Sequence, residues 1–140
     1  MRITLFILTL ILIFSGCTET DKVDFNKDLL KLSTERQKKL DTGIGMLQTE
    51  RKFLAETDSM LSLIYNKTLE NGIDTKTLKI EQKSFELKRK KVSDSLWLEV
   101  DKVFRETGME PELDKIIAYG IVADLNFVRA MILNNELISK

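Results

Sequence analysis

Five ionisable residues stand inside the apolar stripes of this sequence, where most positions carry aliphatic side chains. They are Arg36, Arg51, Asp58, Arg89 and Asp124. Asp124 lies closest to the middle of its stripe, about 20° from the centre line at 100° per residue. A buried charge is costly unless an opposite charge pairs with it. We therefore expect ion pairs between helices, with Asp124 meeting Arg51 or Arg89. The alternative is a polar ligand pocket around Asp124.

Few other side chains of this chain could catalyse a reaction or bind a metal. It has no His, and its single Cys is Cys17, which excludes structural zinc, Cys–His nucleophile pairs and internal disulfides. Ser95 and Ser139 have no His to activate them. A site made of carboxylates alone stays formally possible, but no spacing resembles an EF-hand calcium loop. We expect a protein without enzymatic activity, metal or cofactor.

The first seventeen residues, MRITLFILTLILIFSGC, have the three parts of an export signal. Arg2 supplies the positive start, residues 3–14 form an apolar run, and the small pair Ser15-Gly16 precedes Cys17. The run is shorter than the ~20 apolar residues that a transmembrane helix needs. This arrangement is typical of a secretory signal peptide.

Ser-Gly-Cys after an apolar core resembles the lipobox of bacterial lipoprotein precursors, although Phe14 stands where Leu is commonest. The resemblance implies a signal peptide over residues 1–16 that is removed, and a diacylglycerol and an N-acyl chain such as palmitate on Cys17. Two acyl chains give stable membrane attachment. Thr18 replaces the Asp that would resemble an inner-membrane retention signal, which favours the outer membrane in a diderm cell. An ordinary cleaved signal or an uncleaved anchor is the alternative.

The remaining chain divides into a lipidated tether, residues 17–24, and one helical domain, residues 25–140. Loss of Arg2 with the leader changes the net charge from 0 to −1, so no excess of positive charge points to nucleic acid. The basic run 88–91 would fan around a helix beside neighbouring acids, as solvated charges do. Six Gly and one Pro are too few for the turns of an all-β fold.

The apolar spacing predicts an all-α fold with three antiparallel helices, and the first should be the longest. Residues 25–69 keep one apolar phase across Gly43 and Gly45, which favours a single helix whose excess length forms a stalk. A true break at these glycines, which would give a four-helix bundle, is the alternative. Asp58 and Arg51 occupy positions that a two-stranded coiled-coil seam would fill with apolar residues, so intramolecular packing is expected.

The second helix, residues 75–106, is apolar on two sides. Its second face carries Ile80, Leu87 and Leu98 with Trp97 nearby, and this face is a candidate interface if no helix covers it. The third helix, residues 111–138, should bury its apolar stripe in the core rather than cross a membrane, because charged residues interrupt it. The stripe consists of Leu113, Ile117, Ile121, Leu125, Val128, Met131 and Ile132.

These features predict a lipid-anchored protein of the bacterial cell envelope, facing away from the cytoplasm, that binds another protein or braces the envelope. A chaperone or immunity-type binder of one client protein is one alternative. A small-ligand sensor that uses a pocket around Asp124 is another.

Overall fold

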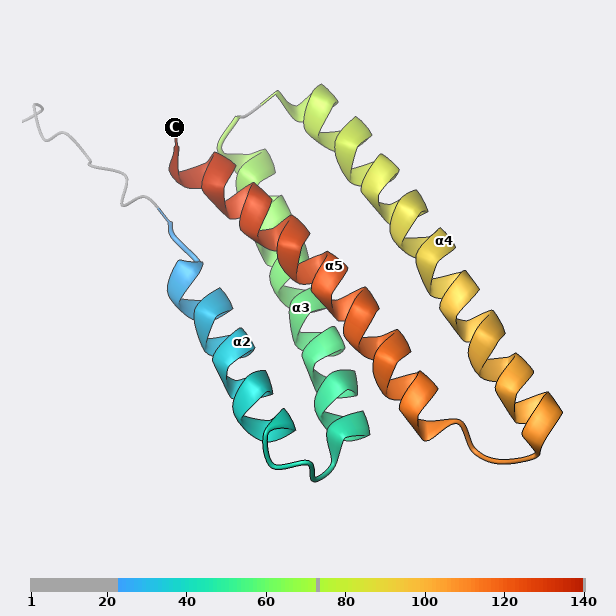
Figure 1. Ribbon diagram of the computed structural model, residues 1–140. Coiled ribbons are helices and arrows are strands. Elements are labelled where there is room, and N and C mark those ends of the chain that lie inside the picture. Colours follow the sequence, from blue (N-terminus) through green and yellow to red (C-terminus); the bar gives the residue numbers. More distant parts are fainter. Residues whose placement is uncertain (1–22, 73, 140) are drawn as a thin grey trace, which may run out of the picture.

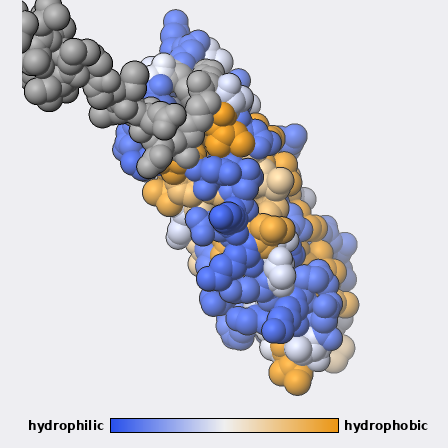
Figure 2. Space-filling view, turned by 90° about the vertical axis from the view of Figure 1, so that its left-hand side faces the viewer, coloured by the Kyte–Doolittle hydropathy of each residue, from blue (hydrophilic) through white to orange (hydrophobic). Residues whose placement is uncertain are grey.

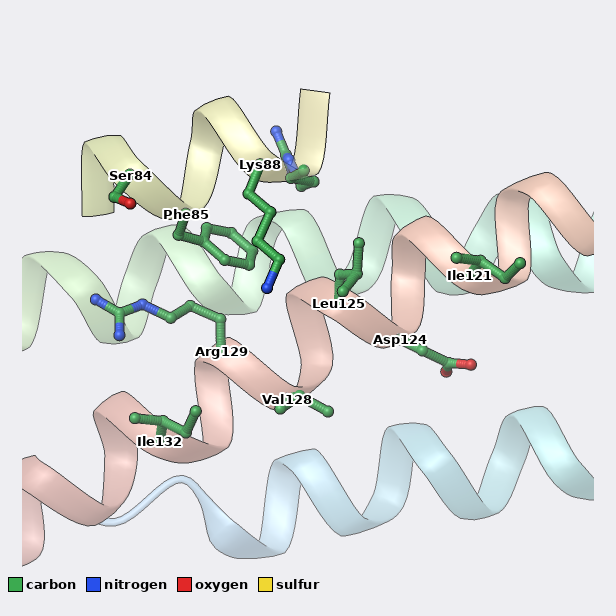
Figure 3. A pocket seen from close by; sticks show the side chains of 10 residues that line it. Ser84, Phe85, Lys88, Ile121, Asp124, Leu125, Val128, Arg129 and Ile132 are labelled. Carbon is green, nitrogen blue, oxygen red and sulfur yellow. The ribbon is translucent and has the colours of Figure 1, made fainter. Parts of the chain in front are cut away.

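The computed structural model describes residues 23–72 and 74–139, and these residues form four helices and no strand. They are α2 (Asn26–Leu40), α3 (Met46–Glu70), α4 (Thr75–Thr107) and α5 (Glu112–Ile138). Consecutive helices run antiparallel, as predicted, and α5 lies between α2 and α4 with α3 behind it (Figure 1, Figure 3). The expected leader, Cys17 and most of the tether lie outside the described residues.

Local sequence signals set the ends of α3, α4 and α5. The chain after α3 turns at Gly72, whose φ is 69°. Asp74 caps α4, because its side chain accepts the backbone N–H groups of Lys76 and Thr77, each at 3.2 Å. Gly108, with φ 67°, ends α4, and Pro111 stands at the start of α5. Both predicted connections are therefore present.

The prediction of one continuous first helix with a stalk is wrong. The chain leaves the helix after Leu40 and re-enters at Met46, and Gly43 and Gly45 have φ values of 68° and 63°. Only glycine adopts this left-handed region without steric cost. The reversal lays α2 back along α3, so the apolar phase that continues across the two glycines serves two packed helices (Figure 1).

Replacing Gly43 or Gly45 with Ala should lower the free energy of unfolding by about 1–2 kcal/mol at each site, because an L side chain is strained at these φ values. In a continuous helix the same substitutions would raise stability by about 1 kcal/mol. Equilibrium denaturation of the two variants therefore decides between a turn and a helix by the sign of the change. A Gly45→Asn variant should lose less stability than Gly45→Ala, because Asn tolerates the left-handed region better.

The core lies mainly between the parallel helices α3 and α5, which make the most extensive contact in the molecule. Small residues on both helices let the backbones approach, among them Thr57 on α3 and Ala123 and Ala130 on α5, all fully buried. Larger apolar side chains fill the end of the molecule at which α2 begins and α5 ends. They are Phe25, Leu29, Leu61, Ile64, Leu78, Leu133 and Leu137.

α4 is the least embedded helix. Of its 33 residues only Leu78, Gln82 and Val100 are buried. Phe85 and Trp97 are half-buried, so the middle of α4 rests on its neighbours through side chains that solvent still reaches. This loose packing leaves a groove between α4 and α5.

α5 is the one helix of the described chain that is long and apolar enough to cross a membrane. An 18-residue window in it has a mean hydropathy of 1.7, and 39% of that window is buried inside the molecule. Asp124, Asn126 and Arg129 lie within the helix, and α5 packs against the other three helices. Burial in the core therefore accounts for only part of the apolar surface of α5.

Asn134 joins the start of the described chain to the end of α5. Its side-chain oxygen accepts the Phe25 N–H at 3.0 Å, and its amide donates to Asp24 at 3.0 Å. This hydrogen bond from Asn134, with one from the backbone N–H of Asn26, lowers the pKa of Asp24 below its ordinary value of 3.8.

The stability that Asp24 contributes is therefore complete above its unfolded pKa and is lost as the pH falls through the lower folded pKa. The melting temperature of an Asp24→Asn variant should lie below that of the unchanged chain near neutral pH. The difference should shrink once the pH falls below about 3.8, the ordinary pKa. Thermal unfolding of both proteins from neutral pH to below this value measures the difference in melting temperature. A difference that stays constant would show that the charge of Asp24 has no role.

Candidate interaction surface

The predicted core stripe of α5 is exposed, which reverses the expectation for this helix. Six of its seven residues face solvent, with exposed fractions from 39% to 66%, and Leu125 is half-buried. We call these six residues the α5 outer face. They are Leu113, Ile117, Ile121, Val128, Met131 and Ile132.

The buried side of α5 lies opposite this face. At 100° per residue the six exposed residues fall within an arc of about 100°, and the buried residues centre about 180° away. Ala123 and Ala130 allow α3 to approach there, and the buried Asn126 and Asn134 find hydrogen-bond partners. Close approach and satisfied amides therefore bury the less apolar side, and the larger aliphatic side chains stay in solvent.

A groove of about 510 Å³ runs along this face between α5 and α4 (Figure 3). Phe85 and the stem of Lys88 form its α4 wall, and Leu125, Val128 and Ile132 form its α5 wall. Arg129, also in the lining, is held by Gln82 at 3.3 Å and by Glu81 at 3.6 Å. Within the described chain no ion pair involves Lys88, which is exposed. The α4 rim of the face is therefore positively charged.

On the α2 side of the face, Asp124 belongs to a cluster that joins α2, α3 and α5. Arg36 donates to Asp124 at 2.5 Å and to Glu50 at 2.9 Å, and its guanidinium stacks over the Phe53 ring at 4.4 Å. Gly120 leaves the space that this guanidinium occupies, since a Cβ there would lie 3.2 Å from it.

Glu50 is 4% exposed, whereas Asp124 is partly open to solvent. Burial opposes the charge on Arg36, but the hydrogen bonds to Glu50 and Asp124 outweigh it and raise the pKa of Arg36. The charges are thus paired between helices. The expected partner was wrong, because Asp124 meets Arg36 rather than Arg51 or Arg89.

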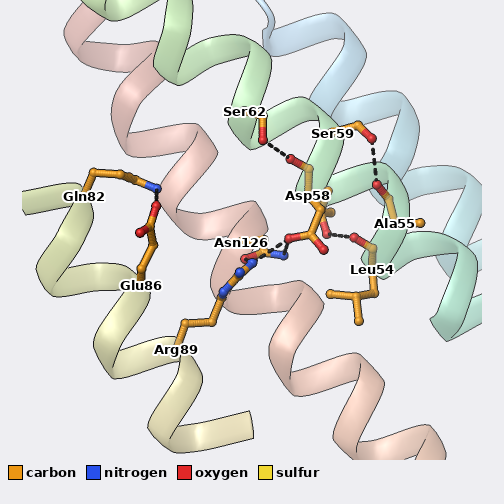
Figure 4. Close-up of polar contacts among 10 residues, drawn as sticks. Leu54, Ala55, Asp58, Ser59, Ser62, Gln82, Glu86, Arg89 and Asn126 are labelled. Carbon is orange, nitrogen blue, oxygen red and sulfur yellow. Dashed lines mark hydrogen bonds and ion pairs between the residues drawn. The ribbon is translucent and has the colours of Figure 1, made fainter. Parts of the chain in front are cut away.

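A second polar cluster joins α3, α4 and α5 (Figure 4). Arg89 donates to Asp58 at 2.5 Å and to Asn126 at 2.8 Å, and the Asn126 amide donates to Asp58 at 2.7 Å. Asn126 is fully buried. This cluster satisfies an amide inside the core and fixes α4 against α3 and α5 where apolar packing is sparse.

Arg51 has a different role from the one expected. Its guanidinium lies over the Tyr119 ring at 5.2 Å, and Trp97 packs edge-on against the same ring at 5.0 Å. Trp97 is therefore a contact between α4 and α5 rather than a free interface residue.

The candidate interface on α4 is exposed but not continuous. Ile80, Leu87 and Leu98 are 61–63% exposed, and polar residues such as Lys83 and Lys91 separate them on that side of the helix. Isolated apolar residues of this kind are ordinary on protein surfaces. The side that α2 forms is also largely hydrophilic, with smaller apolar patches (Figure 2). The more extensive apolar surface is the α5 outer face, which the periodicity predicts as core.

Within residues 23–72 and 74–139 no group of three or more His, Cys, Asp or Glu side chains is arranged to hold a metal ion. The fold and this surface define an all-helical protein with an apolar face on its central helix. Comparisons with protein-family models, curated proteins and solved structures found no match.

Proposed function

We propose that this chain is a lipid-anchored protein of the bacterial cell envelope that binds another protein through the α5 outer face. The lipobox-like start supports attachment through Cys17 to a membrane, with the outer membrane favoured in a diderm cell. The helical domain would then face away from the cytoplasm. The proposal includes no catalysis, no metal, no cofactor beyond the covalent lipid, and no nucleic acid.

The observation that carries the binding role is the exposure of six neighbouring aliphatic residues on one helix. Together they present on the order of 500 Å² of apolar surface, which is the size of the largest and often functional patch on a monomer. Lys88 on α4 borders it on one side, and Asp124 lies within the arc toward α2, where it pairs with Arg36. An apolar centre with a polar rim is the usual composition of a protein interface.

Site-specific photo-crosslinking in living cells tests the binding role. A photoreactive amino acid at Val128, on the α5 outer face, should give discrete protein adducts. The same group at Leu30, an exposed Leu on α2, is the matched control and should give few. A third position, Leu87, tests the α4 face. Adducts at Leu87 but not at Val128 would move the interface to α4, and no adducts at any position would contradict a binding role.

Attachment is tested separately with an alkyne-labelled fatty acid and membrane fractionation. The unchanged chain should incorporate the label and sediment with membranes, whereas Cys17→Ala should do neither. Labelling that persists in Cys17→Ala would contradict the lipobox resemblance without affecting the α5 surface.

A small-ligand carrier is the second candidate, and the groove between α4 and α5 favours it. Its volume of about 510 Å³ lies within the range of small-molecule sites, and its lining is mostly apolar. Asp124→Leu should abolish binding of a ligand that uses this pocket while the fold persists. A change in stability alone would show that Asp124 acts only through its ion pair with Arg36 and would contradict the pocket. A client-specific chaperone or immunity role would instead appear as one stoichiometric adduct at Val128.

A further inference from the structure

We propose that the partner of the α5 outer face is a second copy of this chain, with the two α5 helices parallel and related by a two-fold axis. This inference rests on the proposed function, because it names the partner of the same surface. It follows from the size of the face, the charges on its two rims and the end of the molecule at which α2 begins.

The face is large enough to form the centre of a dimer. Leu113 and Ile132 are 19 residues apart, which corresponds to ~29 Å along a helix. Its apolar area, on the order of 500 Å², together with the charged rims approaches the ~800 Å² per partner that a standard interface buries. The most apolar helix of the described chain, only 39% buried over its most apolar window, would then be covered on both sides.

The charges on the two sides of the face select the orientation. Asp124 lies on the α2 side of the face, bound to Arg36, and Lys88 reaches over the groove from α4 on the other side (Figure 3). A two-fold axis parallel to α5 places the α2 side of one face, with Asp124, against the α4 side of the other, with Lys88, twice. A perpendicular axis, which makes the helices antiparallel, brings like rims together. The parallel arrangement therefore pairs opposite charges.

The parallel arrangement also suits a common membrane tether. The hydrogen bond from the Phe25 N–H to Asn134 places the start of α2 beside the end of α5. Parallel α5 helices thus bring the first residues of the two α2 helices to the same end of the dimer, as two chains anchored in one membrane require.

A lipid surface fits the face less well than a second copy. Amphipathic helices that lie on membranes are rich in Lys and Arg on their polar flank. α5 instead carries four acidic residues and two basic ones, so its own charge does not favour anionic lipids, and Lys88 adds one cation on the α4 side. We therefore treat membrane binding as an outcome that overturns the proposal.

Cysteine crosslinking tests both the partner and the orientation. In the purified full chain with Cys17→Ser, an introduced Cys is the only thiol. Single variants Ile117→Cys, Ile121→Cys and Val128→Cys should each form a disulfide-linked dimer under mild oxidation, because equivalent residues meet all along a parallel two-fold interface. Leu87→Cys, which is more open to solvent than any of these positions and lies on α4, is the control and should remain monomeric.

A charge reversal tests the rim pairing without disturbing the fold. Lys88→Glu, at an exposed residue with no ion pair among the described residues, should raise the dimer dissociation constant about tenfold or more, because it places like charges opposite Asp124. Lys91→Glu makes the same charge change outside the groove lining and should alter the constant less than about twofold. Analytical ultracentrifugation measures both.

The expected result is a crosslinked dimer at each of the three α5 positions, together with dimer association that Lys88→Glu weakens and Lys91→Glu does not. A dimer at only one position indicates antiparallel helices and overturns the proposal. Monomers throughout, combined with photo-adducts of a different protein at Val128, overturn the second copy and leave the binding function standing. If the chain stays monomeric, gives no protein adducts and binds vesicles of anionic and zwitterionic phospholipid, both the second copy and the protein-binding function are overturned.

Discussion

Replacing Leu133 with Ala should lower the free energy of unfolding by about 2–5 kcal/mol, whereas Ile132→Ala should lower it by less than about 1 kcal/mol. Leu133 is 0% exposed in the core between α3 and α5, and its neighbour Ile132 is 45% exposed on the α5 outer face. Truncating Leu133 therefore leaves a cavity, but truncating Ile132 does not.

Chemical denaturation of the two variants, at protein concentrations low enough to suppress association, measures this difference. The pair is a matched test, because both residues are branched aliphatics at successive positions of one helix. Equal losses, or a larger loss for Ile132, would contradict the orientation of α5 and restore the face that periodicity alone predicts for the core.

Replacing Arg36 with Ala should lower the free energy of unfolding by about 3–5 kcal/mol, because the change leaves Glu50 buried without its counter-charge. Arg36 donates both Nε and Nη2 to the same Glu50 oxygen, at 3.2 and 2.9 Å, and packs over Phe53. One substitution thus removes the ion pairs to Glu50 and Asp124, three hydrogen bonds and the contact with the ring.

The double variant Arg36→Met/Glu50→Leu should regain most of this stability, since apolar residues of similar size often replace a buried ion pair without loss. Urea denaturation of the single and double variants forms the comparison. Equal losses in the single and double variants would show that the packing of Arg36, rather than the orphaned charge, holds α2 in place. The exposed pair Lys52–Glu56 on α3, at 3.3 Å, is the control, and Lys52→Ala should cost under about 1 kcal/mol.

These variants separate two kinds of contact that hold the helices together. Leu133 belongs to the apolar core of α3 and α5, whereas Arg36 and Arg89 each centre a polar cluster that joins three helices. α2 and α4 flank that core and make fewer contacts with it. The two clusters therefore position the outer helices, and with them the rims of the α5 outer face.

The sequence alone determined that the described chain is helical and where most helices end. Asp74 as a cap, Gly72 and Gly108 as stops and Pro111 as a start act through the backbone within a few residues, so each is readable locally. Ion pairing between helices also followed from the sequence, because charges inside apolar stripes require partners. The same reasoning could not choose the partner of Asp124, which depends on where α2 lies.

Only the tertiary structure decided whether Gly43 and Gly45 break the first helix and which side of α5 is buried. The apolar residues keep the same helical phase on both sides of the two glycines, because α2 and α3 both pack into one core. Periodicity cannot distinguish this arrangement from one long helix. On α5, Ala123 and Ala130 permit close approach and Asn126 finds Asp58 and Arg89, so the smaller and more polar side packs inward. Burial follows the contacts that the neighbouring helices can make, and the more hydrophobic side of α5 is left as the surface of the molecule.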